Sequence, residues 1–381
     1  MPLTGALAQG GKAALLAMEI WRDDVNANGG LLGRKVELVY YDDQTKGSNV
    51  PPIYTKLLDV DNVDFVVSGY GTNVTAPAMP VVMQRNLTFI SLFATAVNEN
   101  FHYPCYFQIM PAGPNPSVDW SEGFFAVAAQ QDPKPKTVAF LSSDAEFAQN
   151  TVTGARINAK KYGFDVIYDE KYPPSTTDYT PIVRAIKARN PDIVYYLSYP
   201  PESVGLVKAS KELGLAPKMV GGTMVGLHFT AIQTNLGPTL NGISNYGFWV
   251  PEPTMKFPGI DEVLKKYQAQ APKQELDPLG YYLTPFAYAY VEILGKAIEA
   301  TQGLDQKKVC DYLHATEFDT VVGKVKFGDN GEWAKSRMLT FQFQNIGAST
   351  AEEFSGPGKM VILYPPEFKS GDLIYPFPGW K

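Results

Sequence analysis

The stretch NANGGLLGRKVELVYYDDQ, residues 26–44, constrains the fold of this chain more than any other segment. Just before it, from Ala14 to Val25, apolar residues recur at spacings of three and four, which predicts one buried face of a helix. Residues 28–30 then end that helix, because Asn and Gly tolerate the left-handed conformation of a C-terminal cap. Residues 36–41 are β-branched and aromatic, which predicts a strand. Helix, turn and strand together form half of a βαβ unit.

Further strand-like runs follow, and helical patterns separate most of them. They cover residues 65–68, 88–93, 137–142, 165–172, 193–198 and 218–221. This alternation predicts α/β architecture with doubly wound parallel sheets. At 381 residues the chain suits two domains rather than one core. The expected crossings between the domains are the Pro- and Gly-containing segments 110–116, 249–253 and 327–331.

Composition excludes several classes of protein. Hydrophobic residues make up 45% and charged residues 19% of the chain, which is typical of a globular protein. A net charge of -6 provides no basic surface, so nucleic acid is not an expected partner. The sequence contains no apolar run of membrane-spanning length and no signal-peptide pattern. Cys105 and Cys310 lie far apart in the sequence, and both a long-range disulfide and two buried thiols are open.

The sequence gives no catalytic or cofactor motif, so we expect neither an enzyme nor a cofactor. His102, His228 and His314 are scattered and none belongs to an HExxH motif, and no CxxC or GxSxG occurs, which leaves no expected metal site. Gly69-Tyr70-Gly71 lacks the third glycine of GxGxxG. The segment GALAQGGKA, residues 5–13, superficially matches a phosphate loop, but its spacing is one residue too long and Ala stands where Ser or Thr would hold magnesium.

Several ordered motifs carry a resemblance to a known family. They are PLTG at residues 2–5, NGGLLGR at 28–34, the acidic pair at 42–43, and PPEF followed by YPFPGW near residue 380. The chain resembles the type I periplasmic solute-binding proteins of ABC transporters, in the leucine/isoleucine/valine-binding branch. The resemblance implies two doubly wound parallel-sheet domains joined by a three-strand hinge, with a ligand cleft between them.

The resemblance also implies domain boundaries and a location. The first domain would comprise residues 1–114 plus 252–328, and the second residues 115–251 plus 329–381. The expected protein is a periplasmic monomer that delivers its solute to the membrane permease of an ABC transporter. Because PLTG ends the first strand in this family, we expect a signal peptide and a first strand to precede Met1 in the natural protein.

Two loops at predicted strand ends are the expected ligand site of the first domain. In open α/β sheets, ligands bind beyond the carboxyl ends of the strands, where helix N-termini present unpaired amides. Residues 69–78 and 92–96 fit this position. By resemblance, Thr72 and Thr95 bind the ligand carboxylate, Thr95 with its hydroxyl and amide, and Phe93 and Ala94 present backbone groups. As an alternative, Thr72 and Thr95 would only cap helices.

In the second domain, the resemblance places Phe147 and Tyr199 on aromatic residues that close over the ligand, although both could be ordinary core aromatics. The complete expected ligand-binding set is Gln9, Gly10, Tyr70, Gly71, Thr72, Phe93, Ala94, Thr95, Phe147, Tyr199, Thr223, Met224 and Tyr282.

One departure from the family pattern bears on the ligand. Amino-acid binders of this branch carry an acidic residue after the strand that corresponds to residues 218–222, where it pairs with the ligand ammonium, and this chain has Thr223. Burying an ammonium without a countercharge costs on the order of several kcal/mol. Gly10 stands where the family often has Tyr, which is expected to open room for a bulkier ligand. We therefore expect a hydrophobic or aromatic carboxylate.

Two alternatives remain open. Glu202 or Glu146 could supply the charge, which would make the chain a branched-chain or other amino-acid-binding protein. A cytoplasmic sensor of amides or similar solutes could also use the same fold.

Overall fold

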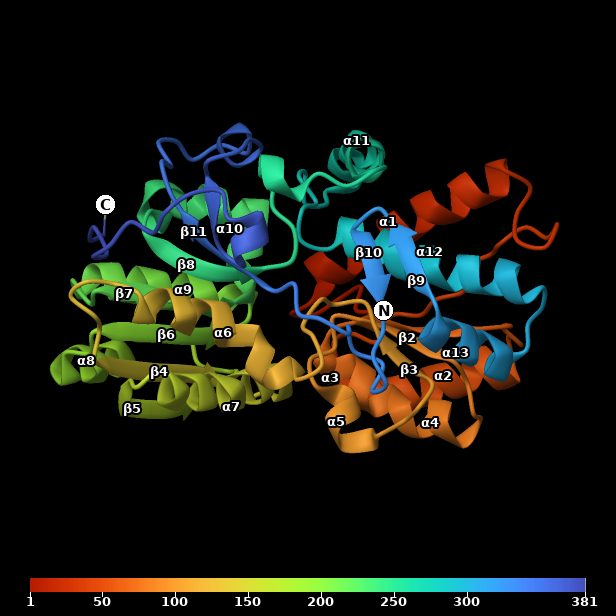
Figure 1. Ribbon diagram of the computed structural model, residues 1–381, viewed down its shortest axis with the longest axis horizontal. Coiled ribbons are helices and arrows are strands. Elements are labelled where there is room, and N and C mark those ends of the chain that lie inside the picture. The colour runs from red at the N-terminus through yellow and green to blue at the C-terminus, as the bar shows by residue number, and fades with distance from the viewer. Residues whose placement is uncertain (381) are drawn as a thin grey trace. The chain divides into compact units, whose positions relative to one another are not determined.

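The computed structural model describes residues 1–380, and the chain divides into two compact units, each built from two separate stretches. Unit 1 comprises Met1–Pro114 and Phe257–Ser336, and unit 2 comprises Asn115–Lys256 and Arg337–Lys381 (Figure 1). The chain therefore passes from one unit to the other three times, at residues 114–115, 256–257 and 336–337. The first crossing lies within the segment 110–116, and the other two follow the segments 249–253 and 327–331.

Unit 1 contains a small parallel sheet with helices around it. The strands of this sheet are β1 (Val66–Tyr70), β2 (Phe89–Leu92) and β3 (Tyr106–Gln108), in that order. Unit 1 also contains a separate antiparallel hairpin of β9 (Glu317–Thr320) and β10 (Gly323–Lys326). Its helices are α1 (Ala8–Ala27), α2 (Val50–Asp59), α3 (Thr72–Thr75), α4 (Met79–Gln84), α5 (Val97–Phe101), α11 (Ile260–Gln270), α12 (Thr284–Thr301) and α13 (Gln306–Ala315). Short 3-10 turns are η1 (Gly47–Asn49), η2 (Ala76–Ala78) and η6 (Ala271–Gln274).

The predicted first helix is confirmed as α1, and Asn28 is its C-cap. Gly29 and Gly30 follow with φ of 102° and 79°, the left-handed conformation that ends the helix. The apolar face of α1 packs against α12, where the ring of Trp21 lies against Gly295. Helix α1 is therefore fixed by a segment more than 250 residues away in the sequence.

The predicted strand at residues 36–41 is wrong. These residues belong to no helix or strand of the described chain. A strand is defined by its ladder of hydrogen bonds, and a favourable residue composition cannot supply a partner. The acidic pair that follows has a separate role: the Asp42 carboxylate accepts from the N–H groups of Leu3 and Thr4 at 2.9 and 3.1 Å and so fastens the PLTG loop.

Unit 2 is built on one seven-stranded sheet of order β12-β11-β8-β7-β6-β4-β5. Its strands are β4 (Thr137–Ser143), β5 (Asp165–Tyr172), β6 (Ile193–Ser198), β7 (Met219–Met224), β8 (Ile243–Gly247), β11 (Leu339–Phe343) and β12 (Met360–Tyr364). Its helices are α6 (Pro116–Ala129), α7 (Glu146–Lys161), α8 (Thr180–Arg189), α9 (Pro200–Glu212) and α10 (Thr230–Leu236). Its 3-10 turns are η3 (Val225–His228), η4 (Gly237–Leu240), η5 (Pro253–Met255), η7 (Glu352–Phe354) and η8 (Pro366–Phe368).

The sheet of unit 2 is mixed rather than purely parallel. Strands β4 to β8 pair in parallel, as the βα alternation predicts, whereas β11 pairs antiparallel with both β8 and β12. Its core includes Phe125, Phe140 and Tyr195, which pack between the sheet and its helices.

None of the helices within residues 1–380 combines the length and the apolarity that crossing a membrane requires.

Candidate functional site

The two loops singled out in the sequence lie side by side in unit 1. Strands β1 and β2 are adjacent and parallel, and Tyr70 at the end of β1 pairs with Leu92 at the end of β2. Gly71 continues this pairing, because its N–H donates to the Leu92 carbonyl at 3.1 Å. Gly71 has φ of 105°, a conformation that L side chains rarely adopt. The glycine therefore lets the chain turn from β1 directly into α3.

Thr72 and Thr95 are hydrogen-bonded to each other across these loops. The Thr95 N–H donates to Thr72 Oγ1 at 3.0 Å, and both residues are buried. The Thr95 amide N–H, which the sequence predicts to bind the ligand, therefore donates to Thr72 within unit 1 instead. Since Thr72 Oγ1 accepts this bond, its own hydroxyl hydrogen remains for another acceptor. Within residues 1–380, the N–H groups of Thr72 and Ala94 donate no hydrogen bond, which leaves further donors at the same place.

Gln108, which no sequence motif singles out, fixes the loop after β2. Its Nε2 donates to the Ala94 carbonyl at 2.8 Å, and its Oε1 accepts from the N–H groups of Phe93 at 3.2 Å and Met110 at 3.0 Å. The Phe93 N–H and the Ala94 carbonyl are thus committed within unit 1. Phe93 and Ala96 adopt left-handed backbone conformations with φ of 56° and 60°, which this bracing holds in place.

Aromatic rings flank these donors in unit 1. The ring of Phe93 lies 5.4 Å from Tyr282 and 6.4 Å from Tyr70, measured between centroids. Gln9 is half-buried in the first turn of α1. The expectation that Gly10 opens room for a ligand is wrong for unit 1, because a Cβ there would lie 2.5 Å from the Tyr70 ring. That space is filled by Tyr70.

In unit 2, Phe147 and Tyr199 belong to a larger aromatic cluster. Phe147 lies in the first turn of α7 and Tyr199 immediately after β6, with ring centroids 5.9 Å apart. Trp120 on α6 packs against Phe147 at 5.4 Å and against Tyr246 on β8 at 4.8 Å. Trp120 and Tyr246 were not selected from the sequence, since an aromatic residue within a helix or strand gives no signal beyond core packing. This cluster gathers at carboxyl ends of the parallel strands.

Thr223 is integrated into the core of unit 2. It lies in β7 with its side chain fully buried, and Trp120 Nε1 donates to Thr223 Oγ1 at 3.0 Å. The Tyr195 hydroxyl is 3.1 Å from the same oxygen. Met224 is also buried, and its N–H and carbonyl both bond the side-chain amide of Asn245. These contacts give both residues a structural function, whatever else they do.

Glu202 and Glu146 differ in their surroundings. Glu202 is buried and accepts from the Ser143 hydroxyl at 3.0 Å, the Tyr172 hydroxyl at 2.8 Å and the Tyr199 N–H at 2.8 Å. Burial raises its pKa above the usual value of a carboxyl group. Glu146 is exposed and forms no ion pair within residues 1–380. Three neutral donors therefore already occupy the Glu202 carboxylate.

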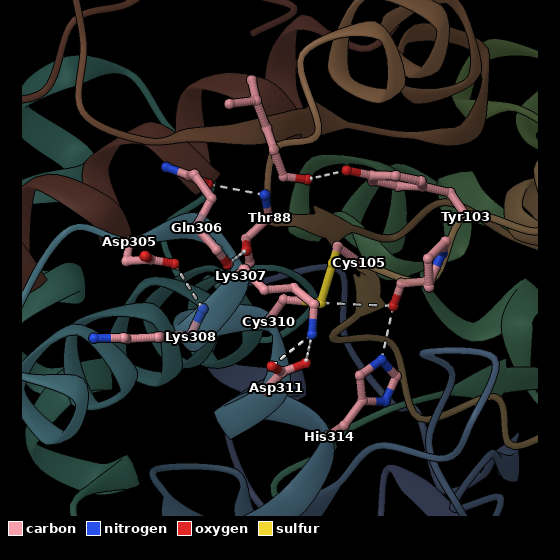
Figure 2. The surroundings of a disulfide bond; sticks show 12 residues. Thr88, Tyr103, Cys105, Asp305, Gln306, Lys307, Lys308, Cys310, Asp311 and His314 are labelled. Carbon is pink, nitrogen blue, oxygen red and sulfur yellow. Dashed lines mark hydrogen bonds and ion pairs between the residues drawn. A yellow bond between two sulfur atoms is a disulfide. The ribbon is translucent and has the colours of Figure 1, made fainter.

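Cys105 and Cys310 form a disulfide, which decides between the two alternatives left open by the sequence (Figure 2). Cys105 immediately precedes β3 and Cys310 lies on α13, so the bond joins the two stretches of unit 1. His314 lies beside this bond (Figure 2), and its Nε2 is 2.7 Å from the Pro104 carbonyl oxygen. Within residues 1–380, no three His, Cys, Asp or Glu side chains gather as a metal ion requires.

Comparisons with known proteins agree with this fold. A family model described as periplasmic binding protein matches residues 1–348. A leucine-, isoleucine-, valine-, threonine- and alanine-binding protein of Pseudomonas aeruginosa is 26% identical over 358 residues, covering 92% of this chain and 90% of that protein. A leucine-binding protein of Thermotoga maritima has a similar structure, with a TM-score of 0.77, 17% identity, and coverage of 90% of this chain and 94% of its own. A solute-binding protein of an R. palustris ABC transporter, solved in complex with benzoate, has a TM-score of 0.78 and 15% identity. The match covers 96% of this chain and 94% of that protein.

Proposed function

Because the chain belongs to the periplasmic binding protein family, we propose that it binds a small aromatic or other hydrophobic carboxylate as the solute-binding component of an ABC uptake system. The family is a non-enzymatic component of transport, and it acts in the periplasm or outside the cell. The expected partner is a membrane permease, and the protein is proposed to act as a monomer. Closure about the hinge would follow binding, with unit 1 holding the ligand first.

The carboxylate part of the proposal rests on the donors of unit 1. The N–H groups of Thr72 and Ala94 and the Thr72 hydroxyl supply three hydrogen-bond donors beyond the ends of two adjacent strands. A carboxylate has two oxygens that together accept about four hydrogen bonds. Bonds from neutral donors to a charged group contribute about 1.5–3 kcal/mol each. A carboxylate therefore matches this arrangement better than a cation does.

The aromatic part of the proposal rests on the two ring clusters. Phe93 with Tyr282 in unit 1, and Trp120 with Phe147 and Tyr199 in unit 2, offer ring faces and edges at contact distances of 5.4–5.9 Å. Aromatic pairs prefer such tilted and edge-to-face arrangements and gain about 0.5–1.5 kcal/mol beyond the burial of their surface. The R. palustris protein solved with benzoate supports this ligand class.

The absence of an ammonium partner separates this ligand from an amino acid. Thr223 is neutral, and its oxygen is engaged by Trp120 and Tyr195. The Glu202 carboxylate is engaged by three donors, so recruiting it as a countercharge would break existing bonds. The second candidate is a branched-chain amino acid, and it is favoured by the P. aeruginosa relative that binds leucine, isoleucine and valine.

Calorimetry with benzoate, phenylalanine, leucine and benzylamine tests the proposal. We expect benzoate to bind and benzylamine, which has the ring without the carboxylate, to show no heat of binding. Leucine or phenylalanine binding more tightly than benzoate would instead establish the amino-acid alternative.

A pair of variants tests the donor group. Thr72→Val removes the hydroxyl at nearly constant volume, so the Kd for the carboxylate is expected to rise roughly 10- to 100-fold, which corresponds to one hydrogen bond to a charged group. Thr72→Ser keeps the hydroxyl and is the matched control, with an expected change of less than about threefold. Equal loss in both variants would point to packing rather than to the hydroxyl.

A further inference from the structure

Unit 2 contains a buried carboxylate, that of Glu202, at the edge of its sheet where the parallel strands end. Glu202 lies in the first turn of α9 and is only 5% exposed. Within residues 1–380, no cationic side chain pairs with it. Burying a charge without a countercharge is unfavourable, so the property that explains a carboxylate here is the set of hydrogen bonds that it accepts.

Helix capping accounts for only one of these hydrogen bonds. The N–H of Tyr199, the N-cap residue of α9, donates to Glu202 Oε2 at 2.8 Å, which is the bond expected of a capping box. Capping requires no further partner of the carboxylate. Here, however, Oε2 also accepts from the Tyr172 hydroxyl at 2.8 Å, and Oε1 accepts from the Ser143 hydroxyl at 3.0 Å. Both of these donors belong to strands rather than to the helix.

The three donors mark the ends of three adjacent strands. Ser143 is the last residue of β4, Tyr172 is the last residue of β5, and Tyr199 follows the last residue of β6. Strand β4 lies between the other two and pairs in parallel with both. One carboxylate therefore joins three neighbouring strand ends at the edge where an α/β domain presents its ligand-binding loops.

Two of these strand ends lead to the aromatic residues that are expected to close over the ligand. Tyr199 is bonded to Glu202 directly, through its own N–H. On the side of β4, Gln149 Nε2 donates to the Ser143 carbonyl at 2.8 Å, which fastens the start of α7, where Phe147 lies, to the same strand end. The rings of Phe147 and Tyr199 are 5.9 Å apart. Both rings are thus connected to Glu202 by short hydrogen-bonded paths.

Ser203, the next residue of α9, braces the same turn from its other side. Its hydroxyl donates to the Tyr199 carbonyl at 2.9 Å and accepts from the Gly226 N–H, in the turn after β7, at 3.2 Å. The backbone of Tyr199 is therefore hydrogen-bonded at both its N–H and its carbonyl. Because the bonds of Ser203 do not involve Glu202, the helix is expected to keep its place when Glu202 is changed.

We propose that Glu202 is a positioning residue of the solute site, which holds Phe147 and Tyr199 in place for closure over the ligand. This role rests on the proposed function, because it assigns both rings to the ligand. Ordering a side chain on binding weakens affinity by about 2- to 10-fold in Kd, so rings that are already held favour tight binding. All three partners of Glu202 donate, so the role requires hydrogen-bond acceptors rather than negative charge.

Two substitutions at Glu202 separate positioning from an effect of charge, with calorimetry against benzoate as the measurement. Glu202→Gln keeps an oxygen that accepts from Tyr199 and Tyr172, and its NH2 group can donate to Ser143 Oγ, so the Kd is expected to stay within about threefold. Glu202→Leu has a similar volume and no acceptor, and its Kd is expected to rise roughly tenfold. Equal weakening by both variants would overturn the proposal, because Glu202 would then act through its charge.

A matched pair of variants leaves Glu202 in place and also covers the case in which Glu202→Leu does not fold. Ser143→Ala and Tyr172→Phe each remove one hydroxyl donor from the carboxylate, but only Ser143 leads towards a ligand-closing ring. The Kd for benzoate is expected to rise about threefold or more in Ser143→Ala and to change less than about 1.5-fold in Tyr172→Phe. Equal Kd values in the two variants would overturn the proposal.

Measurements without ligand distinguish the failure of this role from the failure of the proposed function. In Glu202→Leu, the near-UV circular dichroism of the cluster of Trp120, Phe147 and Tyr199 is expected to weaken, and amide exchange at Tyr199 to become at least tenfold faster. Glu202→Gln is expected to match the unchanged protein in both. If the unchanged protein binds neither benzoate nor an amino acid, the proposed function fails. Unchanged dichroism and exchange in Glu202→Leu would instead overturn the positioning role alone.

Discussion

Replacing Cys105 and Cys310 with serine removes a covalent link between the two stretches that build unit 1. The bond closes a loop with a sequence separation of 205 residues, which contains the whole first stretch of unit 2. In the chain-entropy model, a loop of about 200 residues removes roughly 18 cal/mol/K from the unfolded ensemble, or about 5 kcal/mol at 25 °C. Nearby contacts remain in the variant, including Thr88 Oγ1 to the Gln306 carbonyl at 2.6 Å, so the native state is expected to persist.

Urea unfolding followed by far-UV circular dichroism measures this effect. The double variant is expected to lose about 2–5 kcal/mol of unfolding free energy, with dithiothreitol producing the same loss in the unchanged protein and none in the variant. If the loss occurs in a separate first transition while the remaining signal unfolds at the original midpoint, the bond stabilises unit 1 alone. A loss below about 0.5 kcal/mol would refute the reasoning, because the two stretches would then be held without help from the link.

Three further changes have defined outcomes. Gly10→Ala is expected to lower the unfolding free energy by about 1 kcal/mol, since crowding against Tyr70 outweighs the gain of helix propensity, and a more stable variant in thermal melts would contradict this. Trp120→Phe is expected to cost at least about 1 kcal/mol in urea unfolding, because it keeps one six-membered aromatic ring but leaves Thr223 Oγ1 without its indole donor. Burial lowers the pKa of His228 to about 3, so the unfolded chain binds this proton first and stability falls as the pH decreases from 6.5 towards 3. The slope is at most about 1.4 kcal/mol per pH unit, and His228→Gln is expected to reduce it; an unchanged pH profile would contradict this assignment.

The sequence predicted the elements whose signals are local. Strands β5 and β6 occupy the predicted ranges 165–172 and 193–198. Strand β6 is a single apolar and aromatic run, whereas β5 begins with a short apolar run and continues with charged residues, and both lie between helical patterns. The strand predicted at residues 36–41 was wrong because their composition is that of a strand, but strand pairing depends on distant segments. Strands β11 and β12 were not predicted, although LTFQF and MVILY are compositions typical of strands. Their antiparallel addition to a parallel sheet could not be predicted, because pairing with β8 and with each other depends on distant segments.

Some residues of the candidate site could also be predicted from the sequence, and others could not. Thr72 and Thr95 could be chosen from their positions after strand-like runs, and the structure places them in mutual contact. Gln108 could not be chosen, because its function depends on reaching back to Phe93 and Ala94 from the next strand. At Gly10, the missing side chain suggested empty space, but a glycine also permits close packing by a neighbouring ring.

The interleaved construction of the two units has a consequence for biosynthesis. Helix α1 emerges early from the ribosome, yet its packing partner α12 is made only after the first stretch of unit 2 has been translated. Unit 2 in turn waits for β11 and β12, which follow the last residues of unit 1. Neither unit can complete its core until nearly the whole chain has been synthesised, so the nascent protein remains incompletely folded for most of its translation.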